Sequence, residues 1–395
     1  MIIAPGIELQ AHVSPSRIAV KLDGIQKKPG YDAVMNRFEI ATAQRIVFGR
    51  GVVSELEALC SEWGSKVLLV TGSDSNRFAV LPQATRLAVS GEPKISDVER
   101  GAALAKGVDV VVAIGGGSVI DAGKAIAAMA TQPRDLMRYI EVIGEGKALD
   151  AAPLPFIAVP TTAGTGAEAT RNAVIASETH RVKASLRHVS MLPRVALIDP
   201  ELARGAPPAV TAASGMDALT QCLEAFVCSR AQPMTDALCV DGIQRAVRSL
   251  EKAFHDGNDL DAREDMALCA LYSGMALTNA GLGAVHGYAA PIGGMFPAPH
   301  GAVCAALLAP VWAANALRVA HLDKFDRVDA MLGGDAVAFL RGMTERLGIP
   351  KLHTWGIQES DLDEIARKAA AASSMKANPV VLGHDELVGI LREAL

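Results

Sequence analysis

The chain has 395 residues, of which 50% are apolar and 21% are charged, and its formal net charge is −5. A single hydrophobic core rarely extends beyond about 250–300 residues, so this length predicts two domains. The slight acidic excess gives no attraction to nucleic acid or to an anionic membrane surface, and no apolar run reaches the ~20 residues that cross a bilayer. We therefore expect neither nucleic acid nor a membrane as a partner.

The first residues and the cysteines indicate a cytoplasmic protein. Residues 1–36 contain several Pro and Gly and no chemical motif, so we interpret them as an N-terminal extension. They lack the basic region and the long apolar core of a signal peptide. The six cysteines form no Cys-x-x-Cys pair, which favours buried reduced thiols over disulfides.

Short apolar runs predict the strands of an α/β domain over residues 37–205. They lie at residues 46–49, 66–70, 110–114, 155–159 and 195–199. Their alternation with helix-sized spans predicts an open, mostly parallel sheet. Ligands of such sheets bind at the carboxyl ends of the strands, so the turns at residues 71–73, 115–117 and 160–166 should face one cleft.

The turn after the third run carries the strongest local signal. Gly115, Gly116 and Gly117 follow a strand buried on both faces, and Ser118 with Asp121 resembles a capping box at a helix start. Such a turn aims backbone N–H groups and the positive end of a helix dipole at an anion, which predicts a pyrophosphate site. A tight turn that needs glycine only for steric reasons would explain one or two of the three. The spacing to the following Gly-Lys pair excludes a Walker loop.

The pattern changes after Asp199 and Pro200. Pro207–Pro208 marks a junction, and residues 206–395 are predicted to be almost wholly helical, with helical spacing at 217–224, 262–277 and 303–317. The sequence thus predicts an α/β domain followed by a helical domain, and domain boundaries of this kind are favoured ligand sites.

A candidate metal site lies in the helical half. His286 and His300 are each followed by glycine, which leaves room around the imidazole, and Asp217 and Gln221 share one face of a predicted helix. Asp, His and His would give a divalent metal three protein ligands and an open position. On spacing alone, two ordinary surface or core histidines are the alternative.

Several segments together resemble the iron-containing (group III) alcohol dehydrogenase family, which includes glycerol dehydrogenases and maleylacetate reductases. The similarity extends over residues 37–395. The matching segments are Gly115–Asp121, Pro160–Glu168, Asp199–Glu224, Gly281–Gly301 and Asn378–Pro379. The resemblance implies a Rossmann-like α/β dinucleotide-binding domain followed by an all-α domain that holds a metal, the dehydroquinate synthase-like fold.

The resemblance also implies where NAD(P) binds. Residues 115–118 should lie at the pyrophosphate, the threonines at the ribose and nicotinamide, and Lys183 at the nicotinamide ribose. Its sequence context alone would make Lys183 a solvated surface charge. The expected contacts are Gly115, Gly116, Gly117, Ser118, Asp121, Thr161, Thr162, Thr165 and Lys183.

One departure from the family pattern concerns the metal. Members with four metal ligands have a histidine at the position of Gln221, whereas Asp217, His286 and His300 match the three-ligand pattern of zinc-type glycerol dehydrogenases. We expect these three residues, with Gln221 as a weak neutral ligand, to hold Fe²⁺ or Zn²⁺. A vacant site, in which these side chains act as hydrogen-bond donors, is the alternative. Ala290 also replaces a family histidine, so proton transfer would run through water, the cofactor ribose or Tyr288.

A second departure concerns the cofactor. NAD-dependent members tend to end the strand matching residues 66–70 with an acidic residue, but this chain has Gly72 and Ser73, with Arg77 close behind. Without a carboxylate there is no repulsion toward a 2′-phosphate, so the sequence favours NADP, with NAD tolerated. A solvated helix residue is the alternative for Arg77.

The resemblance implies reversible hydride transfer between NAD(P) and a small alcohol, aldehyde or ketone, with Asp217, His286 and His300 as the catalytic centre and a homodimer as the assembly. Reduction of an unsaturated keto acid, as in maleylacetate reductases, is one alternative, with Arg171 as its substrate-binding candidate. A lyase of the dehydroquinate synthase kind lacks its basic signature here. A degenerate dinucleotide-binding protein without turnover is the alternative of another class.

Overall fold

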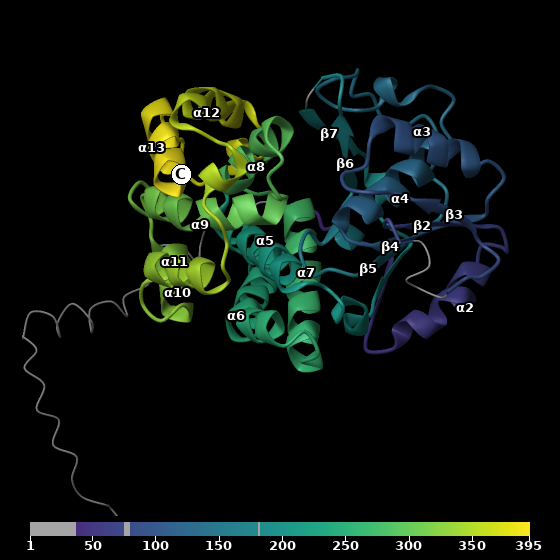
Figure 1. The fold of residues 1–395 in the computed structure, drawn as a ribbon, viewed down its shortest axis with the longest axis horizontal. Helices are drawn as coiled ribbons and strands as arrows, with labels where there is room; N and C mark the ends of the chain where they lie inside the picture. The colour runs from purple at the N-terminus through teal and green to yellow at the C-terminus, as the bar shows by residue number, and fades with distance from the viewer. Residues whose placement is uncertain (1–36, 75–79, 181) are drawn as a thin grey trace, which may run out of the picture. The chain divides into compact units, whose positions relative to one another are not determined.

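A six-stranded parallel sheet is the centre of the first half of the chain (Figure 1). The computed structural model describes residues 37–74, 80–180 and 182–395, so the predicted extension at 1–36 lies outside the described residues. The strand order is β1–β8–β5–β4–β2–β3, and every neighbouring pair is parallel. The strands are β1 (Arg45–Phe48), β2 (Val67–Thr71), β3 (Thr85–Ala88), β4 (Val110–Gly115), β5 (Phe156–Pro160) and β8 (Val195–Ile198).

Helices cover both faces of this sheet because its central strands are apolar on both sides (Figure 1). In β2, Leu68 packs with α4 (Gly117–Met129) on one face, whereas Leu69 packs with α2 (Leu56–Ser61) on the other. The alternation follows from the two-residue period of a strand. Helix α3 (Ile95–Leu104) lies beside α4.

A hairpin that the sequence analysis did not identify covers the outer face of α4. Its antiparallel strands are β6 (Asn172–Ser177) and β7 (Val182–Arg187). Lys124 of α4 is fully buried beneath it, and its ammonium group donates to Ala167 O, Thr170 Oγ1 and Asn172 O at 2.8–2.9 Å. All three donors are thus satisfied, so Lys124 ties α4 to the start of β6 and to the segment before it, and is not a phosphate ligand.

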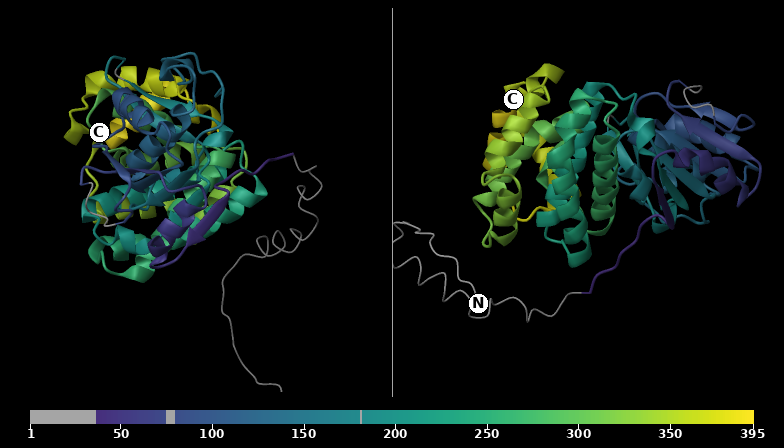
Figure 2. Two further views of the ribbon diagram at one scale, coloured as in Figure 1. Left: turned by 90° about the vertical axis from the view of Figure 1, so that its right-hand side faces the viewer. Right: turned by 90° about the horizontal axis from the view of Figure 1, so that it is seen from below.

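The second half of the described chain is helical, and its helices gather into one bundle (Figure 1 and the right-hand view of Figure 2). The long helix α5 contacts α6, α7 and α9. The α-helices are α5 (Pro208–Val227), α6 (Pro233–His255), α7 (Leu260–Asn279), α8 (Ala284–Met295), α9 (His300–Ala316), α10 (Asp323–Met331), α11 (Ala336–Arg346), α12 (Leu362–Ala371) and α13 (His384–Ala394). Short 3₁₀ helices lie at η1 (Val52–Glu55), η2 (Leu136–Arg138), η3 (Ala167–Ala169), η4 (Val189–Met191), η5 (Pro200–Ala203), η6 (Leu352–Trp355), η7 (Glu359–Asp361) and η8 (Ser374–Ala377).

No single helix of the described residues is long and apolar enough to cross a membrane. One bent pair, α7 with α8, passes that test by length and composition only. Both helices contribute buried residues to the core of the bundle.

Backbone contact joins the loop after β5 to the helical half. Gly166 has a left-handed φ of +60°, and a Cβ atom there would lie 2.4 Å from Ala270 O of α7. A Cβ atom on Gly274 of the same helix would lie 2.2 Å from Gly166 O. The backbone of this loop therefore lies directly against α7 within the compact unit Ile40–Leu395, and this close approach requires glycine at both positions.

Candidate active site

Three predicted metal ligands lie together where α5, α8 and α9 meet. Asp217 Oδ1 lies 3.2 Å from His286 Nε2 and 3.8 Å from His300 Nε2, and the two imidazole rings are 5.3 Å apart between centroids. Asp217 and His286 are buried, while His300, at the first turn of α9, keeps partial exposure. The arrangement presents one oxygen and two nitrogens to a common point, which is a donor set suited to a divalent transition metal.

Cys304 completes this cluster, and the sequence analysis did not identify it. Its Sγ lies 3.7 Å from both His286 Nε2 and His300 Nε2, and one ligand atom from each of the four residues lies within 4.8 Å of the others. Cys304 follows His300 by one turn of α9, so the two side chains share a helix face. That spacing was a signal, but the apolar surroundings of Cys304 favoured an ordinary buried thiol.

Two further buried residues of α5, Gln221 and Glu224, follow Asp217 by one and two helical turns. Gln221 is buried, and its Oε1 has no hydrogen-bond partner among the described residues. Glu224 accepts hydrogen bonds from His286 Nδ1 at 2.6 Å and from the Val285 N–H at 2.7 Å. Because Glu224 holds the Nδ1 proton, His286 directs Nε2 at Asp217, the tautomer that metal ligation requires.

The charges of the cluster stabilise protonated imidazoles. Burial lowers the pKa of His300, but Cys304 and Asp217 raise it more, to about 9 overall. The pKa of His286 is likewise raised, because Cys304, Asp217 and Glu224 outweigh its burial. A metal ion would have to displace these protons, so its affinity should fall as the pH falls.

The glycine turn after β4 has a steric explanation at two of its three positions. A Cβ atom on Gly115 would lie 2.5 Å from Val119 Cβ, and one on Gly117 would lie 2.6 Å from Thr165 Oγ1. A Cβ atom on Gly116 would meet only Thr162, at 3.4 Å, and the φ of Gly116 is an ordinary −73°. Neither contacts within the protein nor the backbone conformation therefore explain why residue 116 is glycine.

The predicted capping box at this turn is wrong. Helix α4 begins at Gly117 with Gly116 as its N-cap, and no side chain caps it. Asp121 instead accepts the Val174 N–H at 2.9 Å and pairs with Lys124 at 3.7 Å, which ties α4 to β6. The first N–H groups of α4 thus lack a side-chain acceptor, as a helix start that binds an anion requires.

The remaining predicted cofactor residues lie around the same strand ends. Thr161 is buried, whereas Thr162 and Thr165 are half-buried and approach Gly116 and Gly117. The residues that follow β2, Gly72 and Ser73, are half-buried and exposed, and Arg77 lies outside the described residues.

Lys183 of β7 is half-buried, and its Nζ donates to Glu92 Oε1 at 2.9 Å. A Cβ atom on Gly293 of α8 would lie 3.2 Å from that Nζ. The Lys183 side chain therefore extends from the hairpin to α8, the helix that carries His286.

Sequence and structure comparisons identify the family. The profile for iron-containing alcohol dehydrogenase matches residues 43–200, and the profile for the C-terminal part of the same family matches residues 211–395. Alcohol dehydrogenase 4 of Schizosaccharomyces pombe is 36% identical over 330 residues, which span 78% of this chain and 74% of that protein. This chain belongs to the iron-containing alcohol dehydrogenase family.

Two further similarities support this family assignment. The 1,3-propanediol dehydrogenase of Klebsiella pneumoniae is 36% identical over 321 residues, which span 78% of this chain and 81% of that protein. A crystal structure of a 1,3-propanediol oxidoreductase has a TM-score of 0.85 at 32% identity and covers 91% of this chain and 100% of its own. The predicted family, fold and enzyme class are confirmed: the chain is an NAD(P)-dependent oxidoreductase that acts on alcohols.

Tyr288 is not available as a proton carrier in this alcohol dehydrogenase. Its side chain is fully buried, and its hydroxyl donates to Leu387 O at 3.0 Å. That part of the predicted proton route is wrong because the hydroxyl is already committed to the fold. Water and the cofactor ribose remain as predicted routes.

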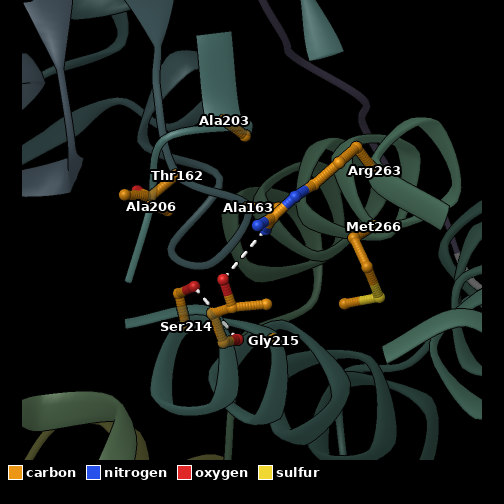
Figure 3. Close-up of a pocket in the computed structure, with 9 residues that line it drawn as sticks. Thr162, Ala163, Ala203, Ala206, Ser214, Gly215, Arg263 and Met266 are labelled. Atoms are coloured by element: carbon orange, nitrogen blue, oxygen red, sulfur yellow. Dashed lines mark hydrogen bonds between the residues drawn. The ribbon is translucent and has the colours of Figure 1, made fainter. Parts of the chain in front are cut away.

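A small pocket near the β5 loop is too small for a substrate (Figure 3). Its volume is about 10 Å³, roughly that of one water molecule. Thr162, Ser214 and Met266 contribute to its lining, and Arg263 lies across it, with Nη1 donating to Thr211 Oγ1 at 2.9 Å. We assign no catalytic role to this pocket in the dehydrogenase.

Proposed function

We propose that this alcohol dehydrogenase transfers a hydride between the nicotinamide C4 of NADP and the carbonyl carbon of a small aldehyde or ketone, reversibly. The observation that carries the proposal is that Asp217, His286 and His300 place their ligand atoms close together in a largely buried cluster. When bound, the dinucleotide supplies or accepts the hydride, and a divalent ion, Fe²⁺ or Zn²⁺, polarises the substrate oxygen.

The protein's own groups would position these partners. Asp217, His286 and His300 would hold the ion, with Glu224 fixing the His286 tautomer at 2.6 Å and Gln221 as a candidate neutral ligand. The orphaned Oε1 of Gln221 supports this, because a buried carbonyl oxygen without a donor is costly unless a cation or water satisfies it.

The cofactor would lie along the carboxyl ends of β2, β4 and β5. Gly116 leaves the backbone open beside an uncapped helix start, which suits a pyrophosphate. Thr161, Thr162 and Thr165 would line the ribose and nicotinamide. Lys183 would donate to the nicotinamide ribose, since its ammonium group lies beside Gly293 of the helix that carries His286.

A preference for NADP over NAD rests on Ser73, which is exposed just after β2. Ser73→Asp should reverse the preference, because a carboxylate repels a 2′-phosphate and accepts ribose hydroxyls. We expect the ratio of kcat/KM with NADPH to that with NADH to fall by about tenfold or more, equivalent to ~1.4 kcal/mol. Steady-state kinetics with one aldehyde measures both values, and an unchanged ratio would contradict the assignment.

The hydride transfer itself is tested by the change in NADPH absorbance when aldehydes, ketones and 1,3-propanediol are supplied in turn. Turnover with small neutral carbonyls supports the proposal. Turnover confined to unsaturated keto acids would favour the maleylacetate reductase type of reaction.

We also propose a cytoplasmic homodimer with domain boundaries at 36/37 and 205/206, the second of which falls between η5 and α5.

A further inference from the structure

We propose that Cys304 is the fourth protein ligand of the metal site, so that the donor set is Asp217, His286, His300 and a thiolate, and that this set selects Zn²⁺ over Fe²⁺. The inference rests on the proposed metal-dependent function and adds a residue that the family pattern does not assign. Cys304 thereby replaces Gln221 as the fourth ligand, and the buried Gln221 Oε1 then requires a water molecule as its partner.

The spacing of the four ligand atoms carries the inference. Zinc bonds of about 2.0 Å to nitrogen or oxygen and about 2.3 Å to sulfur place two nitrogen or oxygen ligands of a tetrahedral site about 3.3 Å apart, and a nitrogen and a sulfur about 3.5 Å apart. The observed separations are 3.2 Å and 3.8 Å from Asp217 Oδ1 to the two imidazole nitrogens, and 3.7 Å from Cys304 Sγ to each of them. Four of the six separations are therefore within about 0.5 Å of those of a tetrahedral zinc site, and the other two are at most 4.8 Å.

The surroundings of the thiol support the same role. Cys304 is fully buried, and its Sγ lies 3.7 Å from each of the two imidazole nitrogens. Cys222, another buried cysteine, instead donates to the backbone carbonyl of Cys269 at 3.9 Å, as an inert core thiol does. In the described part of the chain, Cys304 is the one cysteine that belongs to a group of three or more potential ligand side chains within 4.8 Å of one another.

Thiolate ligation decides the choice of metal. A thiolate is a soft ligand and favours zinc, whereas a neutral glutamine carbonyl suits harder cations. Binding releases to solvent the protons that the Cys304 sulfur and the two imidazoles share, and a metal–sulfur bond forms with no change in oxidation state. Zinc can expand to five ligands during a reaction, so four protein ligands are compatible with the proposed dehydrogenase.

The test is cobalt substitution of the chelator-stripped full-length protein. Co²⁺ takes zinc sites, and its absorption reports the ligands, because sulfur coordination adds an intense near-ultraviolet charge-transfer band to the visible ligand-field bands. We expect one Co²⁺ per chain with that band in the wild type. The band should disappear in Cys304→Ser and Cys304→Ala, and Co²⁺ affinity should fall more than about 100-fold, since an outer-shell partner alone is worth about 10–100-fold.

Two variants serve as controls. Cys60→Ala removes a buried thiol of α2, outside the metal cluster, and Gln221→Ala removes the competing ligand; both should retain the band. Stoichiometric Co²⁺ with ligand-field bands but no charge-transfer band in the wild type would overturn the role of Cys304 and leave the metal-dependent function standing. Absence of bound Co²⁺ in the wild type would overturn both. The wild-type spectrum decides the question even if the Cys304 variants fail to fold.

Discussion

Replacing His286 by alanine is expected to lower kcat/KM by about 10³-fold or more. The imidazole is buried between Asp217 and Glu224, so its loss removes one metal ligand and leaves two carboxylates without their shared partner. Stabilisation of a developing charge by a bound metal is worth several kcal/mol, and ~4 kcal/mol corresponds to about 10³ in rate. The measurement is steady-state kinetics of the two proteins with one aldehyde and NADPH.

The matched control for that variant is His384→Ala. His384 is half-exposed on α13 and pairs with Asp363 at 2.7 Å, a surface contact of little value. Its loss should leave kcat/KM within about twofold of the wild type. A loss below tenfold for His286→Ala would contradict the catalytic role of the cluster. If that variant does not fold, His300→Ala at the partly exposed ligand answers the same question.

Gly116→Ala should weaken dinucleotide binding without destabilising the fold. The protein leaves room for this Cβ atom, but a pyrophosphate lying against the turn would not. Overpacking of about 1–3 kcal/mol predicts a Kd for NADPH that rises about 5–150-fold. Titration by fluorescence gives Kd, and thermal unfolding gives Tm.

Two other glycines distinguish a ligand effect from a packing effect. Gly115→Ala should lower Tm, because its Cβ atom would clash with Val119 at 2.5 Å. Gly389 lies in open space on α13, so Gly389→Ala should not lower Tm and should leave the Kd for NADPH unchanged. An unchanged Kd in Gly116→Ala would mean that the pyrophosphate lies elsewhere.

The central strands were predictable because their physical cause is local. Strands β2 and β4 are continuous apolar runs, as strands buried on both faces must be. Strand β3 has one buried residue out of four at the sheet edge, so it carries no periodic signal, and we expected only a helix-sized span after residues 66–73. The β6–β7 hairpin is held by two alanines and two larger apolar residues that pack on α4, and a contact with a distant helix is not visible in the local sequence.

Part of the site was predictable for a different reason. Asp217, His286 and His300 come from three helices, and the family resemblance, not their spacing, indicated that they meet. Cys304 and Glu224 were missed because each has a common structural explanation, an apolar helix for the thiol and a helix face for the carboxylate. Their positions one turn after His300 and two turns after Asp217 acquire meaning only once α8 brings His286 between them.

The most direct test of the metal centre is the metal content of the purified protein, measured by plasma mass spectrometry after preparation under argon without chelators. We predict close to one metal ion per chain in the wild type, with zinc predominating over iron because of the Cys304 thiolate, and loss of that metal in His300→Ala. A preparation that contains no metal and still reduces aldehydes with NADPH would contradict the proposal, and Asp217, His286 and His300 would then act without a bound ion.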